Sequence, residues 1–222
     1  KLRKGQSFIK IKHLRKLSEL GNIPLDIIEK RILELRTRDR KREVKFKLPI
    51  FTSPELASLI GHCMGDGHLS ERQFSFFNLQ RELVDEVIKN VKIAFSTNVK
   101  PVEFEKDGGW EIEFPTNIAR LIALAGGPVG EKVFLPFDVP EWIKDGTDKI
   151  KIAFIRDLFD DEGWVKMKFI RQSSSTQRMI GINMSKNEKF IESHKQFFEN
   201  IRTILLELRI TPSKVTEMGK TK

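Results

Sequence analysis

The sequence contains little cysteine and no long apolar run. Its one cysteine, Cys63, cannot form an internal disulfide, which fits a reducing compartment and predicts a cytoplasmic, nucleoid-associated protein. No apolar stretch is long enough to span a membrane and none has the pattern of a signal peptide, so we expect no membrane partner. With 222 residues, of which 39% are hydrophobic, the chain can bury the core of one large or two small domains.

Positive charge is concentrated at the two ends of the chain, although the net charge is only +9. Residues 1–50 carry 16 Lys and Arg against 6 Asp and Glu, and residues 151–222 carry 14 against 9. The segment between them is acidic, with 10 basic side chains against 16 acidic ones. Basic segments of this kind favour a polyanion such as nucleic acid as the partner.

The N-terminal segment is predicted to be a basic helical extension. Residues 7–20 have the pattern of an amphipathic helix, Gly21-Asn22 break it, and Pro24 opens a second helix that runs to Leu35. A helix-turn-helix is one interpretation, and a helical hairpin packed on the main domain is the other. The basic run that follows is either an arm that contacts phosphates or a solvated linker. Its candidate DNA-binding residues are Arg36, Arg38, Arg40, Lys41 and Arg42.

Residues 53–67 have the marks of a helix that ends at a carboxylate. Ser53 is a predicted N-cap, Pro54 fits the first helical position, and Gly67 is predicted to end the helix in a left-handed conformation. Asp66 then lies among the free carbonyl groups of the helix C-terminus. An anion is unfavourable there unless a cation is near, and a hard divalent ion would meet that need.

Small residues recur at every fourth position of this helix, at Ala57, Gly61 and Gly65. They form a bare ridge that lets another helix approach closely. Residues 152–163 have the same form, an apolar helix followed by Glu162-Gly163. If the two helices pack side by side, Asp66 and Glu162 come together.

Leu59–Gly67 and Ile155–Gly163 resemble the paired nonapeptide motifs of the LAGLIDADG homing endonucleases. The resemblance covers roughly residues 53 to 215. It implies an α+β fold with two αββαββα-like halves related by a pseudo-twofold axis, the second half shortened. The expected domains are the extension (1–50), the first half (51–147) and the second half (148–222).

The remaining pattern predicts the strands and helices of the two halves. In the first half we expect a strand over 73–77, a helix over 82–95, a hairpin over 102–114 and a helix over 118–125. In the second half we expect strands over 164–170 and 179–183, a helix over 187–208 and a strand over 211–217. The buried face of the hairpin is predicted to carry Val102, Phe104, Trp110, Ile112 and Phe114. Its open face would then hold an acidic strip of Glu103, Glu105, Glu111 and Glu113.

The resemblance implies a site-specific endonuclease that makes a Mg²⁺-dependent double-strand break in a long DNA site, acts as a monomer and serves intron homing. Asp66 and Glu162 would be the metal-binding catalytic acids, one from each half, with backbone carbonyls such as that of Gly65 completing the Mg²⁺ site. Asp161 is a candidate extra ligand. Lys186 matches the basic residue that the family often places near the metal.

Further candidates for DNA contact lie on the predicted strands and loops. The polar loop 171–178 is either a base-reading element or a disordered hairpin tip. The candidates are Arg72, Lys166, Lys168, Arg171, Gln172, Gln177 and Arg178.

Some features argue against an intact enzyme. Asp157 and Asp161 take the ridge positions of the second helix, where carboxylates should resist close packing. His62 is expected at the helix surface rather than on a metal. With the acidic strip and the shortened second half, these features leave two alternatives open: a catalytically degenerate DNA-binding transcriptional regulator, and a maturase that binds intron RNA. An intron or an intein origin is equally open.

Overall fold

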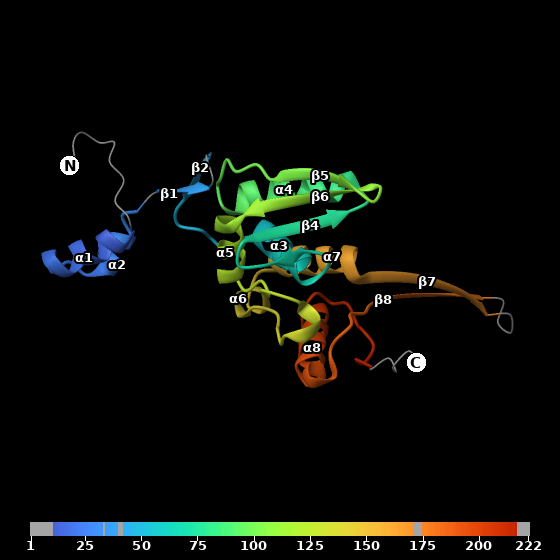
Figure 1. Ribbon diagram of the computed structural model, residues 1–222. Helices are drawn as coiled ribbons and strands as arrows, with labels where there is room; N and C mark the ends of the chain where they lie inside the picture. The colour runs from blue at the N-terminus through green and yellow to red at the C-terminus, as the bar shows by residue number, and fades with distance from the viewer. Residues whose placement is uncertain (1–10, 33, 40–41, 171–174, 217–222) are drawn as a thin grey trace.

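The computed structural model describes residues 11–32, 34–39, 42–170 and 175–216, and its described part is a mixed α+β structure with antiparallel sheets. Two helices, α3 (Pro54–Met64) and α7 (Asp148–Glu162), lie side by side at its centre (Figure 1). Within the described residues, no helix combines the length and the apolar character needed to cross a membrane.

The start of α3 is the one that the sequence predicts. Ser53 is the N-cap, and its hydroxyl accepts the N–H of Leu56 at 3.2 Å. Pro54 occupies the first helical position, where its missing N–H costs nothing. Nearly the whole helix lies in the core, since every residue from Leu56 to Met64 is buried.

The predicted glycine ridge of α3 does face α7. A Cβ atom on Gly61 would lie 2.7 Å from the carbonyl oxygen of Phe154, and one on Gly65 would lie 2.4 Å from the Cβ of Asp161. Both distances are shorter than real Cβ contacts. The absence of side chains at these two positions therefore sets how closely the helices approach.

Gly67 does not end the helix in a left-handed conformation, contrary to the prediction. The helix ends at Met64, and Gly67 has no left-handed conformation. Its N–H donates to the carbonyl of His62 at 2.7 Å, and a Cβ on Gly67 would lie 2.7 Å from that same oxygen and 3.0 Å from the ring of Phe74. Glycine is needed here for space rather than for its φ angle.

The first half carries a four-stranded antiparallel sheet in the order β3-β4-β6-β5. Its strands are β3 (His68–Leu69), β4 (Gln73–Asn78), β5 (Val102–Lys106) and β6 (Gly109–Pro115). Helices α4 (Arg81–Ala94) and α5 (Thr116–Leu124) pack on it, and buried aromatic side chains such as Phe74, Phe76 and Phe114 join it to α3. The strands and helices expected between residues 73 and 125 are therefore present.

The predicted face of the β5–β6 hairpin is right for β6, where Ile112 and Phe114 are at most 1% exposed and Trp110 is partly buried, but it is wrong for β5. Val102 pairs with Glu113 and Phe104 with Glu111, and directly opposed residues share a face. The turn consists of two residues, Asp107 and Gly108, rather than three, and a slip of one residue reverses the face of every side chain on β5.

The acidic strip consequently does not form. Glu103 and Glu105 share the face of Ile112 and Trp110, whereas Glu111 and Glu113 lie on the opposite face. Glu103 is also paired with Arg81 at 2.8 Å. Val102 and Phe104, expected in the core, are 43% and 44% exposed.

The second half is smaller. Strands β7 (Gly163–Ile170) and β8 (Ser175–Ile182) form a two-stranded ribbon that projects from the end of α7 (Figure 1). Helix α8 (Ile191–Glu207) follows after the short η2 (Glu188–Phe190), so it starts later than predicted. Residues 211–216 form no strand, contrary to the prediction. Strand β8 begins at Ser175 and therefore takes up part of the predicted loop 171–178; residues 171–174 lie outside the described part.

The N-terminal extension is not wholly helical. Helices α1 (Ile11–Gly21) and α2 (Leu25–Glu29) are present, but α2 has only five residues and is followed by the hairpin of β1 (Glu34–Asp39) and β2 (Arg42–Lys47). The second helix is therefore shorter than predicted, because Leu35 lies in a strand. The hairpin is anchored by Val44 and Phe46, which are each 3% exposed.

Candidate functional site

Asp66 and Glu162 come together where α3 and α7 end. Asp66 is exposed and Glu162 is partly buried. Burial and the charge of Asp66 raise the pKa of Glu162 to about 7, and burial with the charge of Asp161 raises the pKa of Asp66. Each acid therefore lies in a place where one more negative charge is unfavourable, as expected when carboxylates converge without enough positive charge between them.

Lys132 is the residue that the sequence analysis missed. It opens the short η1 (Lys132–Phe134), and its ammonium donates to the carbonyl oxygen of Gly65 and, at 2.8 Å, to that of Gly67. Its charge partly offsets the rise in the pKa of both acids. Burial lowers the pKa of Lys132 itself, while the nearby acids oppose that change. The ammonium thus lies in the turn that carries Asp66.

Lys186, which the sequence analysis did select, lies behind Lys132. Its ammonium donates to the carbonyl oxygen of Lys132 at 2.7 Å and lies 3.8 Å from the ring centroid of Phe137. Burial and the charge of Lys132 lower the pKa of Lys186 to about 8. It can therefore exchange a proton near neutral pH.

A charged cluster is buried beneath the two acids, between α3 and α7. The Nδ1 atom of His62 lies 3.1 Å from Oδ2 of Asp161, and its Nε2 lies 3.7 Å from Oδ2 of Asp157. All three side chains are at most 1% exposed, so the prediction that His62 lies at the helix surface is wrong. Burial lowers the pKa of His62, but the hydrogen bond to Asp161 and the two aspartate charges outweigh it and raise the pKa overall. Asp161 thus pairs with His62, and Asp157 also accepts the Nε–H of Arg156 at 2.5 Å, so both aspartates have partners where the sequence suggested they could not pack.

The residues can be compared with the expected Mg²⁺ site. Two carboxylates and backbone carbonyls are oxygen donors of the kind that Mg²⁺ prefers, and the raised pKa values of Asp66 and Glu162 favour a nearby cation. The carbonyl of Gly65 is already bonded to Lys132, and both oxygens of Asp161 contact His62. In the described part of the chain, no three His, Cys, Asp or Glu side chains are arranged to hold a metal ion. Of the expected oxygen donors, the carboxylates of Asp66 and Glu162 therefore remain the ones that fit a Mg²⁺ ion.

The candidate DNA-contacting residues are spread over three elements. Lys166 and Arg178 are exposed on the β7–β8 ribbon, and Arg72 is exposed at the β3–β4 turn. Lys168 and Gln177 pair across the ribbon, and Arg36, Arg38 and Arg42 belong to the β1–β2 hairpin. Arg40, Lys41, Arg171 and Gln172 lie outside the described residues.

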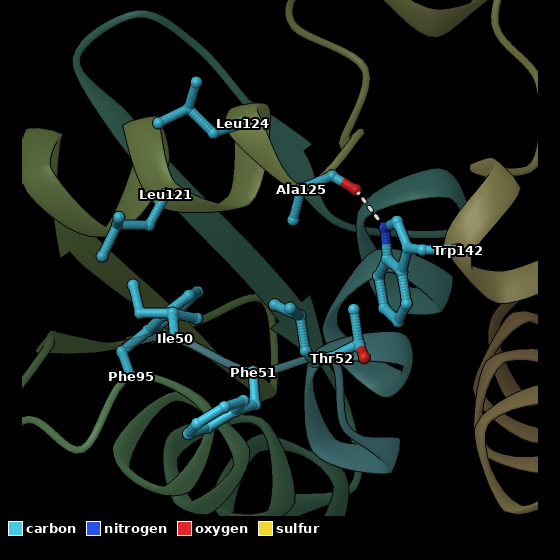
Figure 2. A pocket seen from close by; sticks show the side chains of 9 residues that line it. Ile50, Phe51, Thr52, Phe95, Leu121, Leu124, Ala125 and Trp142 are labelled. Atoms are coloured by element: carbon cyan, nitrogen blue, oxygen red, sulfur yellow. Dashed lines mark hydrogen bonds between the residues drawn. The ribbon is translucent and has the colours of Figure 1, made fainter. Parts of the chain in front are cut away.

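An apolar hollow between α5 and the start of α3 offers no comparable chemistry. Figure 2 shows that Phe51, Leu121 and Leu124 line it, and that Trp142 donates its indole N–H to the carbonyl of Ala125, at 2.8 Å. None of its lining residues titrates. The convergence of acids and lysines at the ends of α3 and α7 is therefore the candidate site.

Comparisons with known proteins place the chain only loosely. No family model matches it. It is 29% identical over 172 residues to a tRNA-splicing ligase RtcB of Methanopyrus kandleri, covering 70% of this chain and 17% of that protein. It is 26% identical over 168 residues to a Replication factor C small subunit of Methanocaldococcus jannaschii, covering 69% of this chain and 9% of that protein. The chain thus spans less than a fifth of these curated relatives.

Among solved structures, a variant of the homing endonuclease I-DmoI is similar with a TM-score of 0.40 and 12% sequence identity, covering 72% of this chain and 74% of that one. This is a distant likeness.

Proposed function

We propose that this chain is a site-specific DNA endonuclease of the LAGLIDADG type, in which Asp66 and Glu162 act together on one double-stranded site. The observation that carries the proposal is their convergence. Two helices held at a glycine-mediated contact bring one acid from each half close together, and the charge of Asp66 helps to raise the pKa of Glu162.

Asp66 and Glu162 would hold a divalent ion such as Mg²⁺. When bound, such an ion supplies an activated water and stabilises the charge that develops on the scissile phosphate. Lys132 adds a fixed positive charge at the Gly65–Gly67 turn and favours the ionised form of both acids. Lys186, with its pKa of about 8, can transfer a proton close to the same place.

The elements around the site suit a duplex of DNA. The β7–β8 ribbon carries exposed Lys166 and Arg178 away from the centre of the molecule, and the basic β1–β2 hairpin lies at the other side (Figure 1). Basic groups spread in this way would contact phosphates over a long site, which explains why we propose DNA rather than a small phosphate ester as the substrate.

The curated relatives indicate whether such an enzyme is encoded in an intron or in an intein. One is named as a tRNA-splicing ligase and the other as a replication factor subunit, and the matching segment is a small part of each. A segment shared by proteins with such different names does not account for either activity. We infer that it is an insertion translated in frame with its host, which favours an intein origin over the intron origin considered above.

The second candidate is a DNA-binding regulator that has lost catalysis. The observation in its favour is that the ammonium of Lys132 is already bonded to the carbonyl of Gly65, one of the oxygens expected to bind the metal. In that case Lys132 would replace the ion as the charge that neutralises Asp66 and Glu162.

Cleavage of a DNA library with Mg²⁺, followed by sequencing of the ends, separates these functions. We expect wild type to cut both strands at one long site, and Asp66→Asn and Glu162→Gln to cut nothing. Asp160→Asn, which alters an exposed neighbour of the site, should cut like wild type. Binding without cleavage by wild type would favour the regulator, and preference for folded RNA over duplex DNA would favour the maturase.

A further inference from the structure

The buried cluster of His62, Asp157 and Asp161 is fitted to the helix contact. Gly65 leaves the space that the side chain of Asp161 fills, since a Cβ there would overlap it. At Gly61 the backbone of α7 comes closest, and a Cβ there would lie 3.4 Å from the Cβ of Asp157. Buried carboxylates are costly without a partner, and His62 supplies one within the same contact.

Asp161 connects this cluster to the candidate site. Its Oδ2 accepts the backbone N–H of Asp66 at 3.1 Å, while both of its oxygens contact Nδ1 of His62 at 3.1 to 3.2 Å. The carboxylate thus links an imidazole in the helix contact with the backbone of the first catalytic acid.

The N–H of Asp66 needs this acceptor because the helix no longer provides one. The carbonyl of His62, four residues earlier, is the oxygen that a continuing helix would offer to Asp66. That carbonyl accepts the N–H of Gly67 instead, at 2.7 Å. A charged acceptor makes a stronger hydrogen bond than a neutral one. The backbone at Asp66 is therefore held from the other half of the molecule.

We infer that Asp161 is a positioning residue for Asp66, and that His62 holds Asp161 in place and balances its charge. The assignment rests on the proposed endonuclease function. Asp161 then acts on the reaction only through the placement of Asp66 and is no metal ligand. Its side chain, which is 0% exposed and hydrogen-bonded on both oxygens, is directed into the helix contact.

The variants Asp161→Ala and Asp161→Asn separate positioning from metal binding. Asparagine keeps an oxygen for the N–H of Asp66 but is a poor metal ligand, whereas alanine removes the acceptor. We expect Asp161→Ala to lower kcat for DNA cleavage by at least about tenfold with KM changed less than about twofold, and Asp161→Asn to restore kcat to within about threefold of wild type. If Asp161→Asn is as inactive as Asp161→Ala, the positioning role is overturned.

A second measurement does not depend on cleavage. In amide NMR spectra, the Asp66 N–H should exchange at least about tenfold faster in Asp161→Ala than in wild type, and should stay protected in Asp161→Asn. His62→Ala should also speed its exchange, whereas His62→Asn, which keeps a donor near the place of Nδ1, should not. Asp160→Ala is the matched control and should change nothing.

The two failures are distinguishable. If wild type cuts no DNA, the proposed function fails while the amide exchange still tests the contact. If wild type cuts DNA but the Asp66 N–H is equally protected in Asp161→Ala, the positioning role is wrong and the endonuclease function stands.

Discussion

Replacement of Gly61 by alanine tests the contact on which the site depends. The new Cβ would lie 2.7 Å from the carbonyl oxygen of Phe154 and 3.2 Å from the backbone nitrogen of Leu158. Both atoms belong to the backbone of α7, so no side chain can rotate away. The helices would have to separate by several tenths of an ångström.

The magnitude follows from two opposed effects. Alanine is the better helix former by about 1 kcal/mol, which alone would stabilise the protein. Overpacking in a close contact costs about 1–3 kcal/mol, and separation of the helices also lengthens the buried bond between His62 and Asp161, now at 3.1 Å. We expect Gly61→Ala to lower the free energy of unfolding by about 2 kcal/mol, or the Tm by about 4–8 °C for a chain of this size.

Urea unfolding followed by circular dichroism measures this change. Gly21→Ala is the matched control, because Gly21 is also helical and its added Cβ would meet only the side chain of Ile23, at 3.5 Å. That variant should stay within about 0.5 kcal/mol of wild type or be slightly more stable. A Gly61→Ala variant as stable as wild type would refute the close helix contact.

Three further predictions concern the site and its supporting helix. The pKa of Glu162 is about 7 instead of 4.5, so the native state keeps a proton that the unfolded chain releases, and the contribution of Glu162 to stability falls as pH rises from about 4.5 to about 7. Glu162→Gln should therefore be more stable than wild type by about 1 kcal/mol at pH 8, after allowance for solvent screening, and equal to it at pH 4; melts that show the same difference at both pH values would contradict this. Lys132→Met should raise the pKa of Glu162 further, as measured by carboxyl ¹³C titration, and an unchanged titration would show that the ammonium does not act on the acid. Ser53→Ala should cost about 1 kcal/mol in urea unfolding while Ser53→Asp costs little, because only aspartate keeps an acceptor for the N–H of Leu56; equal losses would exclude the cap.

The features that could be predicted from sequence are those that depend on residues close together in the chain. The cap at Ser53, the glycine ridge and the positions of the two acids depend on residues within a few turns of one helix, so periodicity is enough to find them. The strands of the first half were found for the same reason. The buried face of β6 was also found, but that of β5 was not, because one residue too many in the predicted turn at Asp107 reverses its register.

The site contains more than those patterns can show. Lys132 is one of 40 Lys and Arg residues and stands in an irregular connection whose course depends on tertiary contacts, so no local signal marks it. The aspartates at the ridge positions of the second helix signal the cluster around His62, but the sequence alone does not show what receives them. Asp161 fills the space beside Gly65, and Asp157 accepts the Nε–H of Arg156.

The same complementarity makes the two central helices non-interchangeable. A second copy of α7 packed on α7 would set Asp157 and Asp161 against identical carboxylates, with neither glycine hollows nor an imidazole to receive them. Two copies of α3 would place hollow against hollow and leave empty space along the contact. The contact therefore needs one copy of each helix, and two copies of either helix alone would not reproduce it.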